Sequence, residues 1–294
     1  MTARTDRRSV LIGLGALAAA GCSNATAGRA IAPVELDLTD LEAREGGRLG
    51  LSVSREGGEA SWRATERFTY CSTFKLFLAA ATLERVARGE ERLDRAVPIT
   101  SDDMISHAPV TGPAVGESLT IEALCQSTVE LSDNPAANIL IREMGGLDSW
   151  RNWYRSIGDS VTRVDRLEPE LNLVDGERDT TTPDQAVANM ARLLAPGQMR
   201  LTPEHQMLLE RWLVDSPTGP NRIKAGAPEG WRVGHKTGTS NLGPVNDIGV
   251  IWSPSNGPIF VAAYYEGPPA DDFTAGEAII GEATRRALEA LGHG

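Results

Sequence analysis

Ser72-Thr73-Phe74-Lys75 is the most informative stretch of this chain, because it sets a serine and a lysine three residues apart. Residues 72–88 contain no glycine or proline and repeat apolar residues at helical spacing, and Gly89 then provides a stop. Positions three apart share a helix face, so the two side chains are predicted to be neighbours. A serine becomes nucleophilic when a base lies within hydrogen-bond reach, and a lysine whose pKa is lowered can be that base.

Taken alone, this pattern also fits a helix-capping serine followed by a surface lysine. Two further segments favour the chemical interpretation: Ser132-Asp133-Asn134 and Lys236-Thr237-Gly238. Separately, the first fits a helix N-cap and the second a plain turn at a strand end. Their joint occurrence, in this order, predicts a serine acyl-transfer site. The start of the first helix would then supply backbone N–H groups to a developing oxyanion.

Lysine usage supports the same prediction. The chain has 29 Lys+Arg but only three lysines, and two of these, Lys75 and Lys236, fall inside the segments. Arginine cannot supply a deprotonatable amine, so lysine at these positions indicates proton chemistry.

Length and composition are those of an ordinary soluble protein with a full core. The 294 residues are 41% hydrophobic and 23% charged, with a formal net charge of −11. No basic stripe is evident, which argues against a nucleic-acid partner. We expect a monomer that acts on a small-molecule substrate. The histidines and cysteines show no ligand spacing, so neither a metal nor another cofactor is predicted.

Residues 1–22 are predicted to be an export signal. Arg7-Arg8 precedes an apolar run that is too short to span a bilayer, and the pair resembles a twin-arginine signal. The run leads to Cys22, which resembles the lipidated residue of a bacterial lipoprotein; cleavage slightly later is the alternative. Residues 23–30 would be a linker. We expect an exported protein, either periplasmic or held at the membrane through a lipid on Cys22 alone.

The two remaining cysteines are Cys71 and Cys125. Export permits disulfides, but Cys71 abuts the predicted nucleophile and Cys125 falls within a helical pattern. Two buried free thiols are therefore expected.

Segments with strand patterns lie at both ends of the chain, and helical patterns lie between them. Helices are predicted over residues 31–43, 72–88, 120–131, 135–144, 147–157, 183–194, 203–214 and 275–291, and strands over residues 48–55, 61–65, 231–236, 248–252 and 259–265. This order predicts an α+β fold in which both ends build one antiparallel sheet with flanking helices. The catalytic domain (31–294) would comprise an α/β lobe (31–68 and 215–294) and an inserted helical lobe (69–214). The site would lie at the seam.

The three segments resemble the motif set of the class A serine β-lactamases and their penicillin-binding relatives. The resemblance includes Arg67-Phe68 ahead of the nucleophile and Trp231 ahead of the third segment. It also includes an irregular stretch, residues 163–182, that is similar to the family's Ω-loop. The resemblance implies hydrolysis of the β-lactam amide of penicillins and cephalosporins through an acyl-Ser72 intermediate, which gives β-lactam resistance.

Within the Ω-loop, Glu168 and Asn172 stand four residues apart, as two groups that hold one water would. The resemblance implies that Glu168 is the general base for deacylation and that Asn172 orients the water. Arg166 and Asp179 would pair to hold the ends of the loop together. The peptide bond before Pro169 is expected to be cis.

The resemblance also implies roles around the second segment. Ser132 would relay a proton to the departing lactam nitrogen, and Asn134 would hold the acylamino side chain of the substrate. Asp133 would be structural and tie the two lobes together. His107 would lie at the mouth of the cleft and offer a stacking surface.

The third segment would bind the substrate carboxylate through Lys236 and Thr237, with Gly238 beside them. Backbone N–H groups of Ser72 and Thr239 would form the oxyanion hole.

Three positions depart from the family pattern. Val245 stands where many members have an arginine for the carboxylate, and Arg222 resembles the substitute used in one branch; a surface arginine is the alternative. Ala79 stands where the family's common disulfide would need a partner for Cys125. Ser240 stands where a second family disulfide would need a partner for Cys71.

Two other functions use the same motifs. A DD-peptidase forms a long-lived acyl-serine, and Glu168 with Asn172 argues against it. A non-hydrolytic β-lactam-binding sensor would normally carry a transmembrane segment, and no apolar run after residue 22 is long enough.

Overall fold

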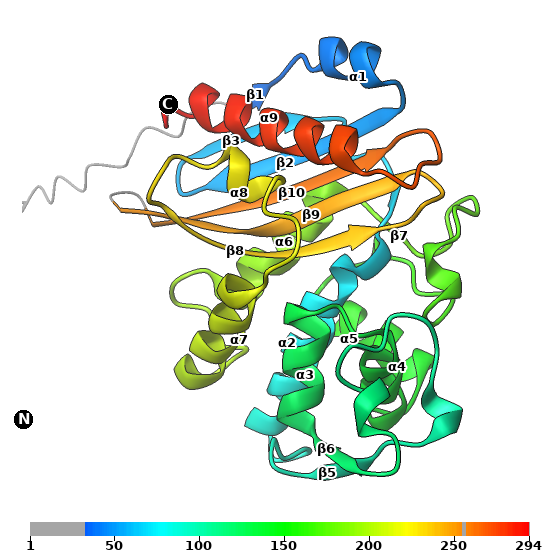
Figure 1. Ribbon diagram of the computed structural model, residues 1–294. Helices are drawn as coiled ribbons and strands as arrows, with labels where there is room; N and C mark the ends of the chain where they lie inside the picture. The colour runs from blue at the N-terminus through cyan, green and yellow to red at the C-terminus, as the bar shows by residue number, and fades with distance from the viewer. Residues whose placement is uncertain (1–32, 255–256, 294) are drawn as a thin grey trace, which may run out of the picture.

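The computed structural model describes residues 33–254 and 257–293, and Figure 1 shows their arrangement. The predicted export signal, the lipidation site Cys22 and the linker lie outside the described residues. No helix in the two described ranges is both long and apolar enough to cross a membrane.

A six-stranded sheet with the order β1-β3-β2-β10-β9-β8 forms the centre of the molecule. Its strands are β1 (Val34–Glu35), β2 (Arg48–Arg55), β3 (Gly58–Trp62), β8 (Arg232–Thr239), β9 (Pro244–Ser253) and β10 (Gly257–Glu266). Neighbouring strands are antiparallel, except that β1 runs parallel to β3. The N-terminal β2 pairs with the C-terminal β10, so the predicted α+β fold, with one sheet built from both ends, is confirmed.

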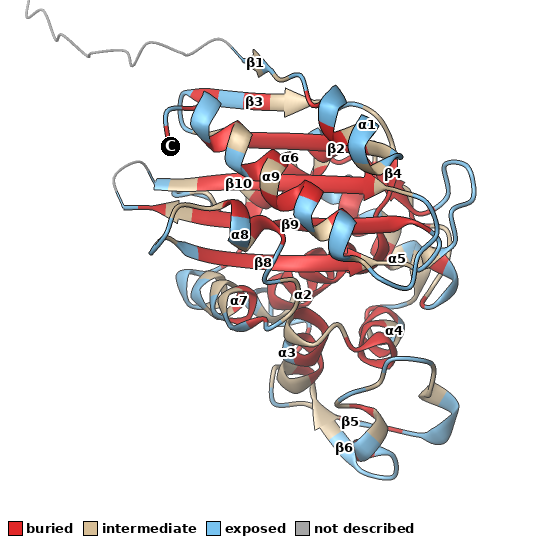
Figure 2. Ribbon diagram, turned by 45° about the horizontal axis from the view of Figure 1, so that its top comes forward, coloured by how far each residue is buried: buried red, intermediate tan, exposed pale blue. Residues whose placement is uncertain are grey.

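Helices cover both faces of this sheet (Figure 1). One face carries α1 (Thr39–Glu45), α8 (Ile223–Gly226) and α9 (Thr274–Ala290). The other face is covered by α6 (Pro183–Leu194) and α7 (Pro203–Asp215), while α2 (Phe74–Ala87), α3 (Ile121–Glu130), α4 (Asn134–Glu143) and α5 (Leu147–Ser156) form a helical part that extends away from it. The central strands are buried on both faces (Figure 2), and one apolar cluster lies on each side of the sheet.

Helix α2 is the central helix of the helical part, because every residue from Phe74 to Glu84 is buried. A helix that is buried all round has neighbours on every side and so holds its side chains in fixed positions. Ser72 lies just before it, in a single 3-10 turn (Cys71–Thr73). The nucleophile is therefore carried by the start of the most enclosed helix.

Two short ladders were not predicted from the sequence. β4 (Phe68–Thr69) pairs with β7 (Thr180–Thr181), and β5 (Ala96–Pro98) pairs with β6 (Ser118–Thr120). The first ladder joins the chain just before Ser72 to the end of the Ω-loop. Segments of two or three residues show no periodicity, so only the tertiary structure reveals them.

Within the described residues, the predicted helix over residues 31–43 is confirmed only from Thr39 onward. β1 occupies its beginning, and α1 starts only at Thr39. The Asp37 carboxylate accepts hydrogen bonds from the backbone N–H and the hydroxyl of Thr39, at 3.0 and 2.6 Å. Such local side-chain bonds favour a turn over a continuing helix, so the helix begins after Asp37.

Candidate active site

Ser72 is placed by a strained turn and by a close approach of strand β8. Cys71, directly before it, has a φ of 45°, which non-glycine residues rarely adopt and which functional sites often contain. Gly238 on β8 lies against this turn: a Cβ on Gly238 would be only 2.8 Å from Tyr70 O and 3.1 Å from Ser72 N. Only glycine lets the strand approach the nucleophile so closely, which gives the third residue of the KTG segment its physical role.

Lys75 lies fully buried beside the nucleophile and beside a carboxylate. Its Nζ is 2.9 Å from Glu168 Oε1 and donates to Ser132 O at 2.8 Å. It also contacts Ser132 Oγ at 3.4 Å and donates to Asn134 Oδ1. Burial lowers the pKa of Lys75, and the adjacent Glu168 carboxylate opposes that change. The predicted lowering of the pKa is therefore present, and burial is its main cause.

The loop before α4 holds the second segment in a fixed conformation. Ser132 has a φ of 60°, and Asp133 caps α4 by accepting a hydrogen bond from Ala136 N at 2.9 Å. The other bonds of Asp133 go to Val110 and Thr111. Across the described residues these partners all lie within the helical part, so Asp133 does not itself tie the lobes together as expected. Its two oxygens already accept four hydrogen bonds there.

Lys236 makes the link between the two parts instead. It lies fully buried on β8, and its Nζ donates to Ser132 Oγ at 3.1 Å and to Thr237 O at 2.8 Å. Burial, and next the positive charge of Lys75, hold the pKa of Lys236 well below its usual value. Ser132 therefore lies between two amines of lowered pKa.

The Ω-loop brings Glu168 to the nucleophile. Ser72 Oγ donates to Glu168 Oε1 at 3.2 Å, and Asn172 Nδ2 donates to Glu168 Oε2 at 2.6 Å. Asn172 Oδ1 is buried and, in the described ranges, has no hydrogen-bond partner, so it can accept one from a water. The Glu168–Pro169 peptide bond is cis, as predicted.

One residue that holds Glu168 was missed from the sequence. Asn138 on α4 donates to Glu168 O at 2.8 Å and accepts from Glu168 N at 3.1 Å. It stands one helical turn after Asn134 and so lies on the same face of α4. The four-residue spacing from Asn134 is the sequence feature that could have pointed to Asn138.

The ends of the Ω-loop are joined by a buried carboxylate. Arg166 Nε lies 2.6 Å from Asp179 Oδ2, which is the predicted pair. Asp179 Oδ1 also accepts from the backbone N–H of Asp165 and Arg166 and from the hydroxyl of Tyr70 at 3.1 Å. Because Tyr70 stands two residues before Ser72, this carboxylate fixes the loop directly to the nucleophile turn. The role of Tyr70 was not predicted.

Ser72 and Ser132 open onto a cleft of about 360 Å³. Its lining consists of Ser72, His107, Ser132, Asn134, Thr218, Gly219, Arg222, Thr237, Thr239 and Phe273. His107 is exposed at this cleft, and its Nε2 lies 2.8 Å from Leu131 O. Thr237 Oγ1 contacts Thr218 Oγ1 at 2.9 Å. Thr218, Gly219 and Phe273 carry no sequence motif and were not predicted.

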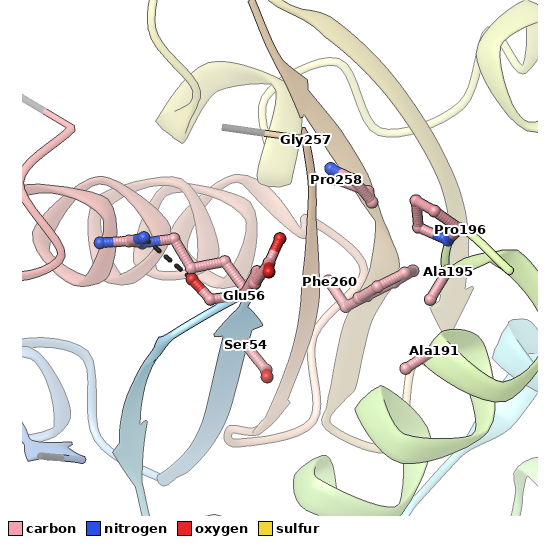
Figure 3. Close-up of a pocket in the computed structure, with 9 residues that line it drawn as sticks. Ser54, Glu56, Ala191, Ala195, Pro196, Gly257, Pro258 and Phe260 are labelled. Carbon is pink, nitrogen blue, oxygen red and sulfur yellow. Dashed lines mark hydrogen bonds between the residues drawn. The ribbon is translucent and has the colours of Figure 1, made fainter. Parts of the chain in front are cut away.

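Figure 3 shows a larger cavity, of about 740 Å³, at a different place on the molecule. Ser54, Glu56, Ala191, Pro196, Pro258 and Phe260 are among its lining residues. It contains none of the motif residues. Size alone would therefore select the wrong place, and the convergence of titratable groups with a nucleophile identifies the smaller cleft.

Arg222 lies in the cleft, and the alternative that it is a surface arginine is wrong. It is only 4% exposed, and its guanidinium donates to Asn246 O at 2.8 Å and to Thr239 Oγ1 at 2.9 Å. Glu277 on α9 lies 3.2 Å from Arg222 Nε. Val245 is also buried and contributes no charge. Arg222 therefore brings a positive charge to the end of the cleft that Thr237 and Thr239 line.

A buried pair that the sequence did not reveal supports this end of the cleft. His235 Nδ1 lies 2.7 Å from Asp247 Oδ2, and both side chains are fully buried. Asp247 Oδ2 also accepts from Ile223 N at 3.1 Å, at the start of α8. The pair thus ties β8 to β9 and to the residue that follows Arg222.

The arrangement defines a class of protein: a serine hydrolase that works through an acyl-enzyme. The hydroxyls of Ser72 and Ser132 line the cleft, and behind them lie two buried amines and a carboxylate within hydrogen-bond reach. The described residues contain no group of three or more His, Cys, Asp or Glu side chains that could hold a metal ion.

The chain belongs to the β-lactamase enzyme family, whose model matches residues 33–291. It is 40% identical over 273 residues to a β-lactamase of Mycobacterium tuberculosis, covering 87% of this chain and 88% of the relative. It is 36% identical to a β-lactamase of Streptomyces albus G, covering 99% of each chain. An ancestral class A β-lactamase has a similar structure, with a TM-score of 0.81, 45% identity and coverage of 86% and 98%. These relatives place the chain in class A.

Proposed function

We propose that this class A β-lactamase hydrolyses the amide bond of penicillins and cephalosporins through an ester on Ser72. Hydrolysis destroys the antibiotic and so gives resistance. The observation that carries the proposal is the contact of Glu168 with both Ser72 Oγ, at 3.2 Å, and Asn172 Nδ2, at 2.6 Å. A carboxylate in this position can serve a nucleophile first and a water afterwards.

In the acylation step, Ser72 Oγ attacks the lactam carbonyl and loses its proton. Ser72 Oγ donates a hydrogen bond to Glu168 Oε1, and Lys75 Nζ contacts the same oxygen at 2.9 Å. Lys75, the predicted base, thus reaches the hydroxyl through this carboxylate. Ser132 Oγ lies next to both lysines and can pass a proton to the lactam nitrogen as the C–N bond breaks. Backbone N–H groups of Ser72 and Thr239 would stabilise the oxyanion.

In the deacylation step, a water attacks the ester carbonyl. Glu168 would accept its proton, and Asn172 Oδ1, which is buried and free to accept, would orient it. The substrate carboxylate would meet Thr237 and the positive charges of Lys236 and Arg222. This geometry favours hydrolysis over the slow acyl-enzyme of a DD-peptidase.

The test is Glu168→Ala, examined by intact-protein mass spectrometry with a penicillin. Acylation should persist because Ser72, Lys75 and Ser132 remain. Deacylation should slow by about 10²–10⁴-fold, the usual effect of losing a positioned general base. The ester should therefore accumulate.

Two variants control the experiment. Ser72→Ala should show no adduct, and Glu170→Ala, an exposed carboxylate two residues further along the same loop, should behave as the parent. Near-parental turnover by Glu168→Ala would contradict the role of Glu168. A parent enzyme that accumulates the ester without turnover would instead be a β-lactam sensor or a DD-peptidase.

We also propose that the protein is exported, that it is lipidated on Cys22, and that it is a monomer. The sequence pattern of residues 1–22 supports export and lipidation. Cell fractionation and labelling with a fatty-acid probe test the proposal, with Cys22→Ser as the control. Label on the parent but not on Cys22→Ser supports lipidation; a soluble, unlabelled parent supports plain cleavage. Size-exclusion chromatography of the purified protein tests the monomer.

A further inference from the structure

Phe273 is the one large apolar side chain that lines the active-site cleft among the described residues. It reaches the cleft from a distant part of the chain, the residue directly before α9. The side chain is partly buried and packs against the apolar cluster beneath α9. In a cleft that is otherwise polar, it offers the substrate an apolar surface.

The same residue also lines a second cavity. That cavity, of about 60 Å³, is lined by Val245, Tyr265, Ala270, Phe273, Gly276 and others. Of the residues that line the two spaces, Phe273 alone is common to both. The Phe273 side chain is therefore the partition between the cleft and a space above Val245.

The partition is held in place by the start of α9. Phe273 O accepts a hydrogen bond from Glu277 N at 2.9 Å. Asp272 Oδ1 accepts from the backbone N–H and the hydroxyl of Thr274, which fixes the turn on the other side. Glu277 in turn contacts Arg222 at 3.2 Å. The position of Phe273 is thus linked to the charge that would bind the substrate carboxylate.

We infer that Phe273 sets how the enzyme discriminates among substituents next to the carboxylate of the substrate. This inference rests on the proposed function, in which Thr237 and Arg222 anchor that carboxylate. In a cephalosporin, the variable ring substituent is carried by the carbon adjacent to the carboxylate-bearing carbon. Anchoring the carboxylate therefore brings this substituent to the end of the cleft where Phe273 stands. A compact apolar substituent gains contact with the ring, whereas a bulky one is blocked from the cavity behind it.

The test compares kcat/KM for a cephalosporin with a bulky substituent at that carbon against one with a methyl group there. Phe273→Ala joins the two spaces, so the bulky-to-methyl ratio should rise by about five- to tenfold, the usual effect of reshaping an apolar pocket. Phe273→Trp should lower the ratio. Should the alanine variant fold poorly, the tryptophan variant still tests the inference.

Two controls separate specificity from stability. Phe273→Leu keeps an apolar partition and should keep the parental ratio. Leu242→Ala removes an exposed leucine of the nearby β8–β9 turn that lines neither space. This variant should leave kcat/KM unchanged for both substrates. Ratios within twofold of the parent in both Phe273→Ala and Phe273→Trp would overturn the inference while leaving hydrolysis intact. A parent that hydrolyses neither cephalosporin would instead contradict the proposed function for this substrate class.

Discussion

Lys75 and Lys236 are chemically different from surface lysines because both are fully buried, and burial lowers the pKa of each. The sequence located both residues through their motifs, and the scarcity of lysine elsewhere made them stand out. The sequence could not show that Ser132 Oγ lies between the two amines, at 3.4 and 3.1 Å, because these contacts join residues 57 and 104 positions apart.

Deprotonation of Lys236 should limit activity at alkaline pH, because it removes the charge that meets the substrate carboxylate. Its pKa lies well below the ordinary 10.5, so the folded protein loses this proton before the unfolded chain does. Stability from this group therefore rises with pH between the lowered pKa and 10.5, while the charge available to a substrate carboxylate falls. Lys236→Arg, which stays charged, should extend the alkaline limb of the kcat/KM profile. An unchanged alkaline limb in this variant would mean that deprotonation of Lys75, not of Lys236, causes the loss of activity.

Arg222 should contribute to substrate binding through its charge. Arg222→Ala should cost about 1.5–3 kcal/mol in kcat/KM, the scale of a charge-assisted hydrogen bond. The methyl ester of the same substrate carries no carboxylate, so Arg222→Ala should lower its kcat/KM much less. Because Arg222 also bonds Asn246 O and Glu277, thermal unfolding must be measured alongside. Equal losses for the acid and the ester would make Arg222 a structural residue.

At the scale of elements, periodicity predicted the long helices α2 to α7 and α9 within a few residues, because each buries an amphipathic or fully apolar surface. It did not predict α8, β4 or β7, which are two to four residues long. These short elements are fixed by tertiary contacts such as the bond from Ile223 N to Asp247. The site depends on them, since β4 and β7 join the Ω-loop to the nucleophile turn.

Asp179→Asn should loosen the Ω-loop and slow deacylation more than acylation. Asp179 is fully buried, and it holds Arg166 at 2.6 Å and Tyr70 at 3.1 Å. Losing the charge should cost about 1–3 kcal/mol of stability, the scale of an unsatisfied buried polar group. Stopped-flow kinetics would separate the two steps. Asp175→Asn is the matched control, because Asp175 is exposed and 3.7 Å from the same arginine; equal effects in both variants would contradict the prediction.

At the scale of the whole molecule, the cleft is lined both by residues of β8, such as Thr237 and Thr239, and by residues at the start of α4, such as Asn134. One apolar cluster fills the helical part and reaches one face of the sheet, and the other lies between the opposite face and α9. The order of strand and helix patterns predicted this architecture. The partition by Phe273 could not be predicted, because a phenylalanine ahead of a helix is indistinguishable in sequence from an ordinary core residue.

The last prediction follows from this division of the core: stability should require neither a disulfide nor a metal. Cys71 and Cys125 are both buried as free thiols, and burial raises the pKa of both, that of Cys125 to about 12. A buried thiol with a raised pKa has almost no thiolate at neutral pH and reacts slowly. In a Cys22→Ser chain, both thiols should resist alkylation in the native protein and react fully after unfolding. Reductant and chelator should leave the thermal midpoint and the hydrolytic rate nearly unchanged. A large loss with reductant would instead reveal a cross-link that supports the fold, and a loss with chelator would reveal a bound metal.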